Sequence, residues 1–81
     1  DLARRLEIAL EHYALTLAFH GDRHGLRIFR KHLAAYIEAA PHRTVEDRRA
    51  ARSRICRLET PREVESALAE WWGQDDGRLA A

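Results

Sequence analysis

The chain has 81 residues, of which 46% are hydrophobic and 33% are charged, and its formal net charge at pH 7 is +1. This balance fits a soluble folded domain and excludes a disordered chain, and the length allows one domain with little room for a deep pocket. No apolar run approaches the roughly 20 residues of a membrane span, and no basic-then-apolar leader indicates secretion.

The first predicted helix, from about residue 2 to residue 20, is apolar on two sides. Its main stripe contains Leu2, Leu6, Leu10, Tyr13 and Leu17, and its second stripe contains Ile8, Leu15 and Phe19. A helix with two apolar sides is either central to a bundle or packed against something outside this chain. Gly21 is expected to end the helix. The short linker over residues 20–22 predicts that the next helix returns roughly antiparallel.

The second predicted helix covers residues 23–41, with Asp22 as its N-cap, and has two different faces. Its apolar stripe contains Leu26, Phe29, Leu33, Tyr36 and Ile37. Steps of three and four residues gather a basic stripe of Arg23, Arg27, Arg30 and Lys31. Four close cations repel each other, and a polyanionic partner would relieve that repulsion. Gly25 either weakens the first turn or permits the close approach of another backbone.

A third helix is predicted from Thr44 to about Leu58, because residues 44–47 resemble a capping box. Its thin apolar content and many arginines make it the least self-sufficient helix, and we expect it to be the most mobile. A fourth helix begins at Thr60, which is followed by Pro61 and then Glu63, and ends at Gly73. Residues 1–73 are therefore predicted as an all-α, four-helix bundle, and residues 74–81 as a disordered tail. The expected core includes Leu10, Leu17, Phe29, Leu33, Leu68 and Trp71.

The positive charge is concentrated in the middle of the chain. Residues 23–62 hold eleven Arg or Lys residues against four acids, whereas residues 1–22 and 63–81 are both net acidic. Thirteen of the fourteen basic residues are arginine, whose planar guanidinium binds phosphate in a bidentate manner. A central basic block of this kind favours a nucleic-acid partner, with a solvated arginine-rich surface as the alternative interpretation.

No pattern in the chain predicts catalysis or metal binding. Cys56 is the only cysteine, so no internal disulfide is possible, which fits a cytoplasmic protein. It has no activating base in sequence and is expected to be half-buried and structural. The five histidines lack a recognisable ligand set. We expect His12, His24 and His42 at the surface, and the tyrosines and tryptophans in the core. Because the chain lacks methionine and begins with Asp1, we expect it to be a piece of a longer protein.

The segment around residues 25–36 resembles a motif of bacterial tRNA-dihydrouridine synthases, in which a sequence of the form GxRIxRKHxxWY opens the second helix of the C-terminal helical domain. The matching residues are Gly25, Arg27, Ile28, Arg30, Lys31, His32 and Tyr36. Ala35 stands where the motif has Trp, which removes one packing contact. Weaker similarity to the same family extends to other parts of the chain, namely residues 12–13, 19–21, 48–49, Ile55 and 60–64. The resemblance therefore covers about residues 6–72.

The resemblance implies a tRNA-binding domain of a larger TIM-barrel flavoenzyme in the cytoplasm. In that family a barrel domain binds FMN, a cysteine of the barrel donates a proton, and NADPH recharges the flavin while uridine is reduced. This chain would then hold no cofactor and no catalytic residue, and Cys56 does not match the catalytic cysteine. The expected partners are tRNA and the barrel of the same protein, which would cover the second apolar side of the first helix. We expect a monomer with no membrane association.

The predicted nucleic-acid-binding residues lie in the second and third helices. They are Arg23, Arg27, Arg30, Lys31, His32, Arg48, Arg49 and Arg52. Phosphate contacts from such residues would fix the register of the RNA without reading its bases. His32 has an alternative role as a hydrogen-bonding residue inside the bundle. Two alternative functions remain open at this point, namely a DNA-binding helical module and a protein-interaction bundle that uses the first helix.

Overall fold

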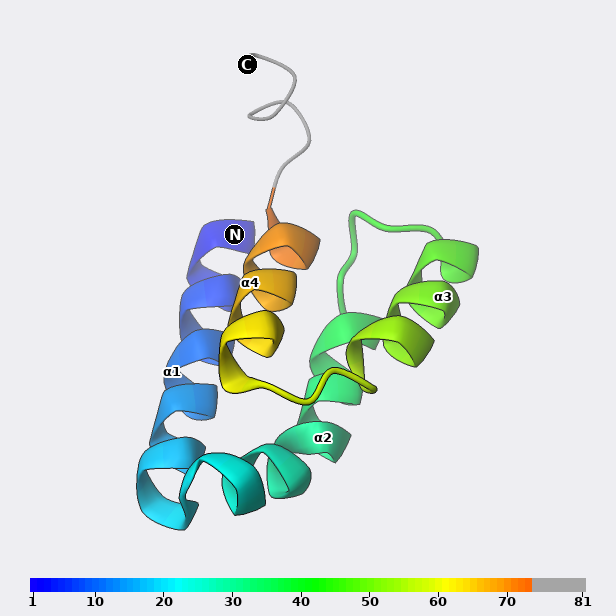
Figure 1. Ribbon diagram of the computed structural model, residues 1–81. Helices are drawn as coiled ribbons and strands as arrows, with labels where there is room; N and C mark the ends of the chain where they lie inside the picture. Colours follow the sequence, from blue (N-terminus) through cyan, green and yellow to red (C-terminus); the bar gives the residue numbers. More distant parts are fainter. Residues whose placement is uncertain (74–81) are drawn as a thin grey trace.

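The computed structural model describes residues 1–73, which form four α-helices and no strand (Figure 1). The helices are α1 at Leu2–His20, α2 at Asp22–Glu38, α3 at Val45–Ile55 and α4 at Pro61–Trp72. The predicted all-α fold with four helices is confirmed, and the tail predicted for residues 74–81 lies outside the described residues. None of the helices over residues 1–73 has the length and apolar character needed to cross a membrane.

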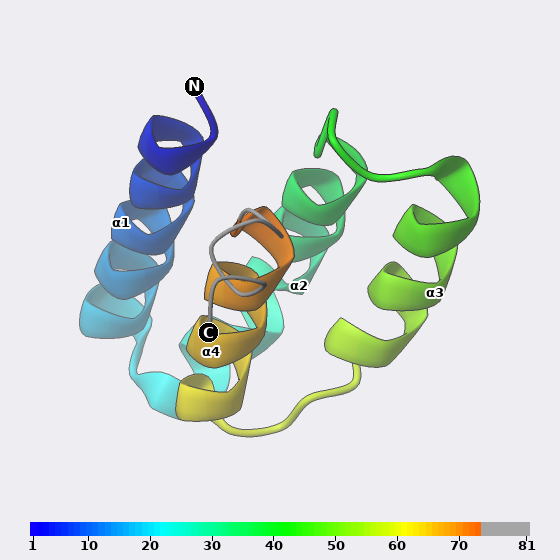
Figure 2. The ribbon, with the colours of Figure 1, turned by 90° about the horizontal axis from the view of Figure 1, so that it is seen from above.

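The central element is α2, which packs against each of the other three helices. α1 and α4 also pack against each other, whereas α3 packs mainly against α2, on the side away from α1 (Figures 1 and 2). α1, α2 and α4 thus form a compact unit, and α3 is an additional outer helix that packs on α2. The greater mobility expected for α3 stays a prediction.

The core is built around the apolar stripe of α2. Phe29, Leu33 and Ile37 are fully buried. Ile55 of α3 and Leu68 of α4 are also fully buried and belong to the same hydrophobic cluster. The predicted burial of Phe29, Leu33, Leu68 and Trp71 is confirmed. Leu10 and Leu17, also predicted to be buried, are only half-buried. They lie at the edge of an α1 stripe that α2 and α4 cover from one side, with Ala9 and Tyr13 at its buried centre.

Gly25 marks the closest approach of α1 and α2. A Cβ atom at this position would lie 3.0 Å from both the Leu17 Cα atom and the Thr16 carbonyl oxygen. The glycine therefore permits two helix backbones to touch, as one of the two sequence interpretations predicted. The linker between the helices is a single residue, Gly21, whose φ of 88° lies in a region that favours glycine.

The prediction of Asp22 as the N-cap of α2 is wrong. Gly21 occupies the cap position and supplies no side-chain hydrogen bond, and Asp22 is the first helical residue. With only one residue between the helices, the cap position falls on the glycine. The carboxylate of Asp22 still lies in the first turn, where the helix dipole favours a negative charge.

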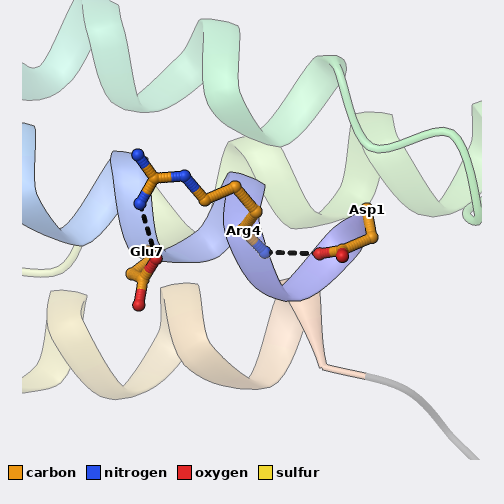
Figure 3. A network of polar contacts seen from close by, with 3 residues as sticks. All are labelled: Asp1, Arg4 and Glu7. Carbon is orange, nitrogen blue, oxygen red and sulfur yellow. Dashed lines mark hydrogen bonds and ion pairs between the residues drawn. The ribbon is translucent and has the colours of Figure 1, made fainter.

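Side chains cap the other three helices at their N-termini. Asp1 accepts a hydrogen bond from the Arg4 backbone N–H at 2.7 Å (Figure 3). Thr44 accepts one from the Asp47 N–H at 3.0 Å, and Thr60 accepts one from the Glu63 N–H at 3.2 Å, as their sequence patterns predicted. α3 ends at Ile55 rather than near Leu58 as predicted, because i to i+3 turns follow it over residues 54–58.

The loop between α2 and α3 is fastened to the C-terminal end of α4. The Arg43 guanidinium donates to the Trp71 carbonyl from Nε at 3.0 Å and from Nη2 at 2.8 Å, and it lies 4.7 Å from the centroid of the Trp71 ring. The Trp71 indole N–H donates in turn to the Ile37 carbonyl at 3.0 Å. These bonds satisfy carbonyls that a helix end leaves without partners, and they hold α4 against the end of α2.

Candidate nucleic-acid interface

An open groove of about 580 Å³ lies between α2 and α3 and is called here the α2–α3 groove. In the described part of the chain it is lined by Arg30, Lys31, Ala34, Arg49, Arg52, Ser53, Cys56 and Arg57. Five of these eight residues are cationic and none is acidic. Such a concentration of one charge in a concave surface attracts polyanions.

The helical periodicity of α3 explains why its arginines face the groove. Ala51 and Ile55 are buried against α2, so positions on the neighbouring side of the helix border the contact. Arg49 and Ser53 of α3 are four residues apart, and Arg57 in the turn after α3 continues this interval, so that the three form one wall. The opposite wall comes from α2, where Lys31 and Ala34 flank the buried Leu33.

Arg30 has a partly structural role. Its side chain is half-buried, and Nη2 donates to the Leu58 carbonyl at 3.1 Å, which fastens the loop after α3 to α2. Among residues 1–73 its buried Nε atom has no hydrogen-bond partner. Buried polar atoms rarely stay unpaired in proteins, so this N–H is an exception among the described residues.

Three of the predicted residues lie outside the α2–α3 groove but adjoin it. Arg23 and Arg27 line a second hollow together with Arg30, and that hollow also contains two acids, Asp22 and Glu59. Arg48 donates from Nε to the Ala40 carbonyl at 3.0 Å and so ties the start of α3 to the loop that follows α2. The cationic surface therefore continues beyond the groove, with acidic residues interspersed at its ends.

His32 lies in a cluster of rings between α1 and α2 rather than in the groove. Its ring centroid is 4.8 Å from that of His12 and 5.9 Å from that of Phe29. His12, predicted to be at the surface, is half-buried here, and its Nδ1 atom is hydrogen-bonded to the Tyr36 hydroxyl at 2.9 Å. The surface prediction for His12 is wrong because the contact with a residue 24 positions away has no local signal.

Cys56 lies in the groove as a half-buried free thiol, as its sequence context predicted. Burial raises the pKa of the Cys56 thiol, although the neighbouring Arg52 and Arg30 guanidinium groups act in the opposite direction. A thiol with a raised pKa is a weak nucleophile at neutral pH. The described residues also bring together no group of three or more His, Cys, Asp or Glu side chains that could hold a metal ion.

Arg57 and Ser53 line the groove but were not among the predicted binding residues. Their signal is present in the sequence, because they continue the four-residue interval that starts at Arg49. Arg57 Nη2 donates to the Ser53 hydroxyl oxygen at 3.0 Å, which holds the arginine along the helix surface. Because the third helix was predicted to run to about Leu58, the four-residue interval from Arg49 could have been extended to Arg57 from the sequence alone.

A second surface feature lies on α1. Ile8, Leu15 and Phe19 are 43%, 66% and 84% exposed, and they form the second apolar stripe predicted for this helix. α2 and α4 cover the opposite stripe. Exposed apolar side chains aligned along one helix are typical of a contact surface.

Comparison of the chain with models of protein families, with curated proteins and with solved structures gives no match.

Proposed function

We propose that the chain is a tRNA-binding helical domain whose α2–α3 groove holds the phosphate backbone of the RNA. The observation that supports the proposal is the charge of the groove, where four cations of α2 and α3 meet Arg57 of the following turn without an acidic residue among the described lining. Each cation that neutralises a phosphate releases condensed counterions, and this release supplies most of the non-specific affinity for nucleic acid.

The groove favours recognition of the backbone over recognition of bases. None of its described lining residues is aromatic, so it offers no platform on which an unpaired base could stack. Phosphate contacts position an RNA without reading its sequence. Folded RNA is recognised largely by shape and by its backbone, which suits a tRNA held and oriented for a reaction elsewhere.

The resemblance of residues 25–36 to the dihydrouridine synthase motif suggests the parent protein. In this proposal the chain belongs to a cytoplasmic, FMN-dependent oxidoreductase that uses NADPH to reduce a uridine of tRNA. A barrel domain outside this chain would hold the flavin and perform the reduction. The 81 residues would contribute no catalytic group, and their part in tRNA processing would be to orient the substrate as a monomeric unit.

The binding residues fall into three groups by their environment. Lys31, Arg49 and Arg57 have exposed side chains in the groove and would contact phosphates directly. Arg30 and Arg48 are half-buried and hydrogen-bonded to carbonyls, so their first effect is on the position of α3. Arg52 is exposed but ion-paired with Glu38.

The test is a salt series of tRNA binding with two charge-matched double variants. Lys31→Gln with Arg49→Gln removes two groove cations, and the control, Arg5→Gln with Arg62→Gln, removes two exposed cations from α1 and α4. If each groove cation neutralises one phosphate, the slope of log affinity against log salt should flatten by about 1.4 to 1.8 in the groove variant. The control should change the slope by much less, and both variants should keep the wild-type melting temperature.

Equal slopes in the groove variant and the control would contradict the assignment of the groove as the phosphate site. Competition between tRNA and duplex DNA in the same assay separates the proposal from a DNA-binding module, because tighter binding of the DNA would favour the module. Absence of tRNA binding at low salt would reject the RNA-binding function itself.

A protein-contact role for α1 is the second candidate, and the exposure of Ile8, Leu15 and Phe19 supports it. In the proposed parent enzyme this surface would pack against the barrel. Substituting Leu15 and Phe19 with Ser should then leave tRNA binding by the 81-residue chain unchanged. Loss of tRNA binding in that variant would place the RNA contact on α1 instead.

A further inference from the structure

One ion pair joins the end of α2 to α3 at the border of the α2–α3 groove. Arg52 Nη1 lies 2.8 Å from Glu38 Oε2, and the side chains remain 59% and 49% exposed. Arg52 lines both the groove and an adjoining hollow, whereas Glu38 lines the adjoining hollow and is absent from the described lining of the groove. The guanidinium of Arg52 therefore stands between an internal carboxylate on one side and the basic groove on the other.

The position of Glu38 is unfavourable for its own helix. It is the last residue of α2, where unpaired carbonyl groups create a negative partial charge, and the last turn of α2 contains no basic residue. Arg52 by contrast lies in the last turn of α3, where a cation is favoured with or without a partner. Helix stability alone thus explains the position of Arg52 but not that of Glu38.

We propose that Glu38 is an internal anion that occupies Arg52 while the groove is empty and thereby sets the affinity of the groove for phosphate. This inference rests on the proposed function, since it assigns a regulator to the same phosphate site. A phosphate that enters the groove replaces Glu38 as the ion-pair partner of Arg52. The Glu38 carboxylate then stays unpaired at the border of the groove. A chain of phosphates can contact several of the groove cations at once, whereas an isolated carboxylate contacts one, so the chain of phosphates compensates better for this exchange.

The exchange is small enough to be reversible. Exposed ion pairs contribute about 0.2 to 1 kcal/mol, which corresponds to a factor of roughly 1.4 to 5 in an equilibrium constant. Removing the carboxylate should therefore tighten binding of a phosphate chain by about 1.4- to fivefold. The direction of this effect is opposite to that of every substitution that removes a cation from the groove.

The experiment compares Glu38→Gln with Glu7→Gln in the 81-residue chain. The control also removes one negative charge and one exposed ion pair, since Glu7 is bonded to Arg4 at 2.6 Å on α1 (Figure 3). The two probes are tRNA and inorganic tripolyphosphate, and melting temperatures are recorded for each variant. We expect Glu38→Gln to bind both probes 1.4- to fivefold more tightly than wild type and Glu7→Gln to show a clearly smaller change.

A double-mutant cycle with Arg52→Gln identifies the cause. When Arg52 is absent, the gain from Glu38→Gln should fall to the level of the Glu7→Gln control, because no cation remains to be released. A gain that persists undiminished in the Arg52→Gln background would overturn the inference, since it would reflect long-range charge alone.

The two probes separate failure of the inference from failure of the proposed function. If Glu38→Gln binds tripolyphosphate no better than Glu7→Gln, the inference is overturned even where tRNA still binds. If the gain appears with tripolyphosphate and tRNA does not bind at all, the tRNA function fails while the role of Glu38 stands. If neither probe binds the wild-type chain or the variant, both are rejected.

Discussion

At the scale of single residues, Tyr13 is a buried phenol with a defined partner. Its ring is 3% exposed and lies 5.0 Å from that of Phe29, and its hydroxyl donates to the Pro61 carbonyl at 3.0 Å. Burial, followed by the nearby carboxylates of Glu65 and Asp22, raises the pKa of Tyr13 to about 12 from its ordinary value of 10.0. The folded chain thus keeps a proton that the unfolded chain releases in alkaline solution.

The raised pKa of Tyr13 predicts an alkaline loss of stability. The protonated Tyr13 hydroxyl contributes to the free energy of unfolding. This contribution is fully present below pH 10.0 and is lost as the pH rises toward 12. Tyr13→Phe should cost about 1 kcal/mol at pH 7 through the lost hydrogen bond, and this difference from wild type should shrink between pH 10 and 12. Urea unfolding followed by tryptophan fluorescence measures both curves. A difference that stays constant over this pH range would contradict the assignment.

Residue environments also show where the sequence alone was insufficient for the site. The basic stripe of α2 follows from helical spacing, and Lys31 of that stripe lines the groove. The partners of Arg30 and Arg52 cannot be read from periodicity, because Leu58 and Glu38 belong to other segments of the chain. Arg30 therefore shares the basic stripe of α2 with Lys31 but differs from it in its contacts, and Arg52 on α3 is held by an ion pair.

At the scale of elements, the helix starts were predictable where a local motif specifies them. Thr60 followed by Pro61 defines the start of α4, and the Thr60 hydroxyl also donates to the Glu63 carboxylate at 2.9 Å. The start of α2 was misassigned because it depends on a one-residue linker, whose length follows from the contact of α1 and α2. The end of α3 was misassigned because residues 54–58 turn toward the carbonyl interaction with Arg30.

At Gly25 helix propensity and packing against α1 have opposite effects on an alanine substitution. In an exposed helix interior, replacing Gly by Ala stabilises by about 1 kcal/mol. At Gly25 the added Cβ meets backbone atoms of Thr16 and Leu17 at 3.0 Å, and a backbone cannot rotate away as a side chain can. We expect Gly25→Ala to lower the free energy of unfolding by about 1 to 3 kcal/mol.

The control for this prediction is Ala35→Gly, at an exposed position of the same helix. It should cost about 1 kcal/mol through propensity alone. Chemical denaturation of both variants gives the comparison. If Gly25→Ala instead gained as much stability as Ala35→Gly loses, the two backbones would have room to separate, and the close contact would not limit the position.

At the scale of the whole molecule, the two unusual surfaces belong to different elements. The cationic groove lies between α2 and α3, and the exposed apolar stripe lies on α1. α1 and α3 are at opposite sides of the molecule (Figure 2). The apolar stripe of α1 and the basic stripe of α2 were expected from the sequence, since each follows from one helix's periodicity. The groove was not expected, because its second wall depends on how α3 packs against α2.

This separation allows the central claim, that RNA lies in the α2–α3 groove, to be tested residue by residue. The most direct measurement is a titration of the ¹⁵N-labelled chain with tRNA, followed through backbone amide and arginine side-chain signals. We expect the largest changes at Lys31, Arg49, Ser53 and Arg57, and none at Leu15 on the outer side of α1. Changes confined to α1, with the signals of α2 and α3 unmoved, would contradict the account.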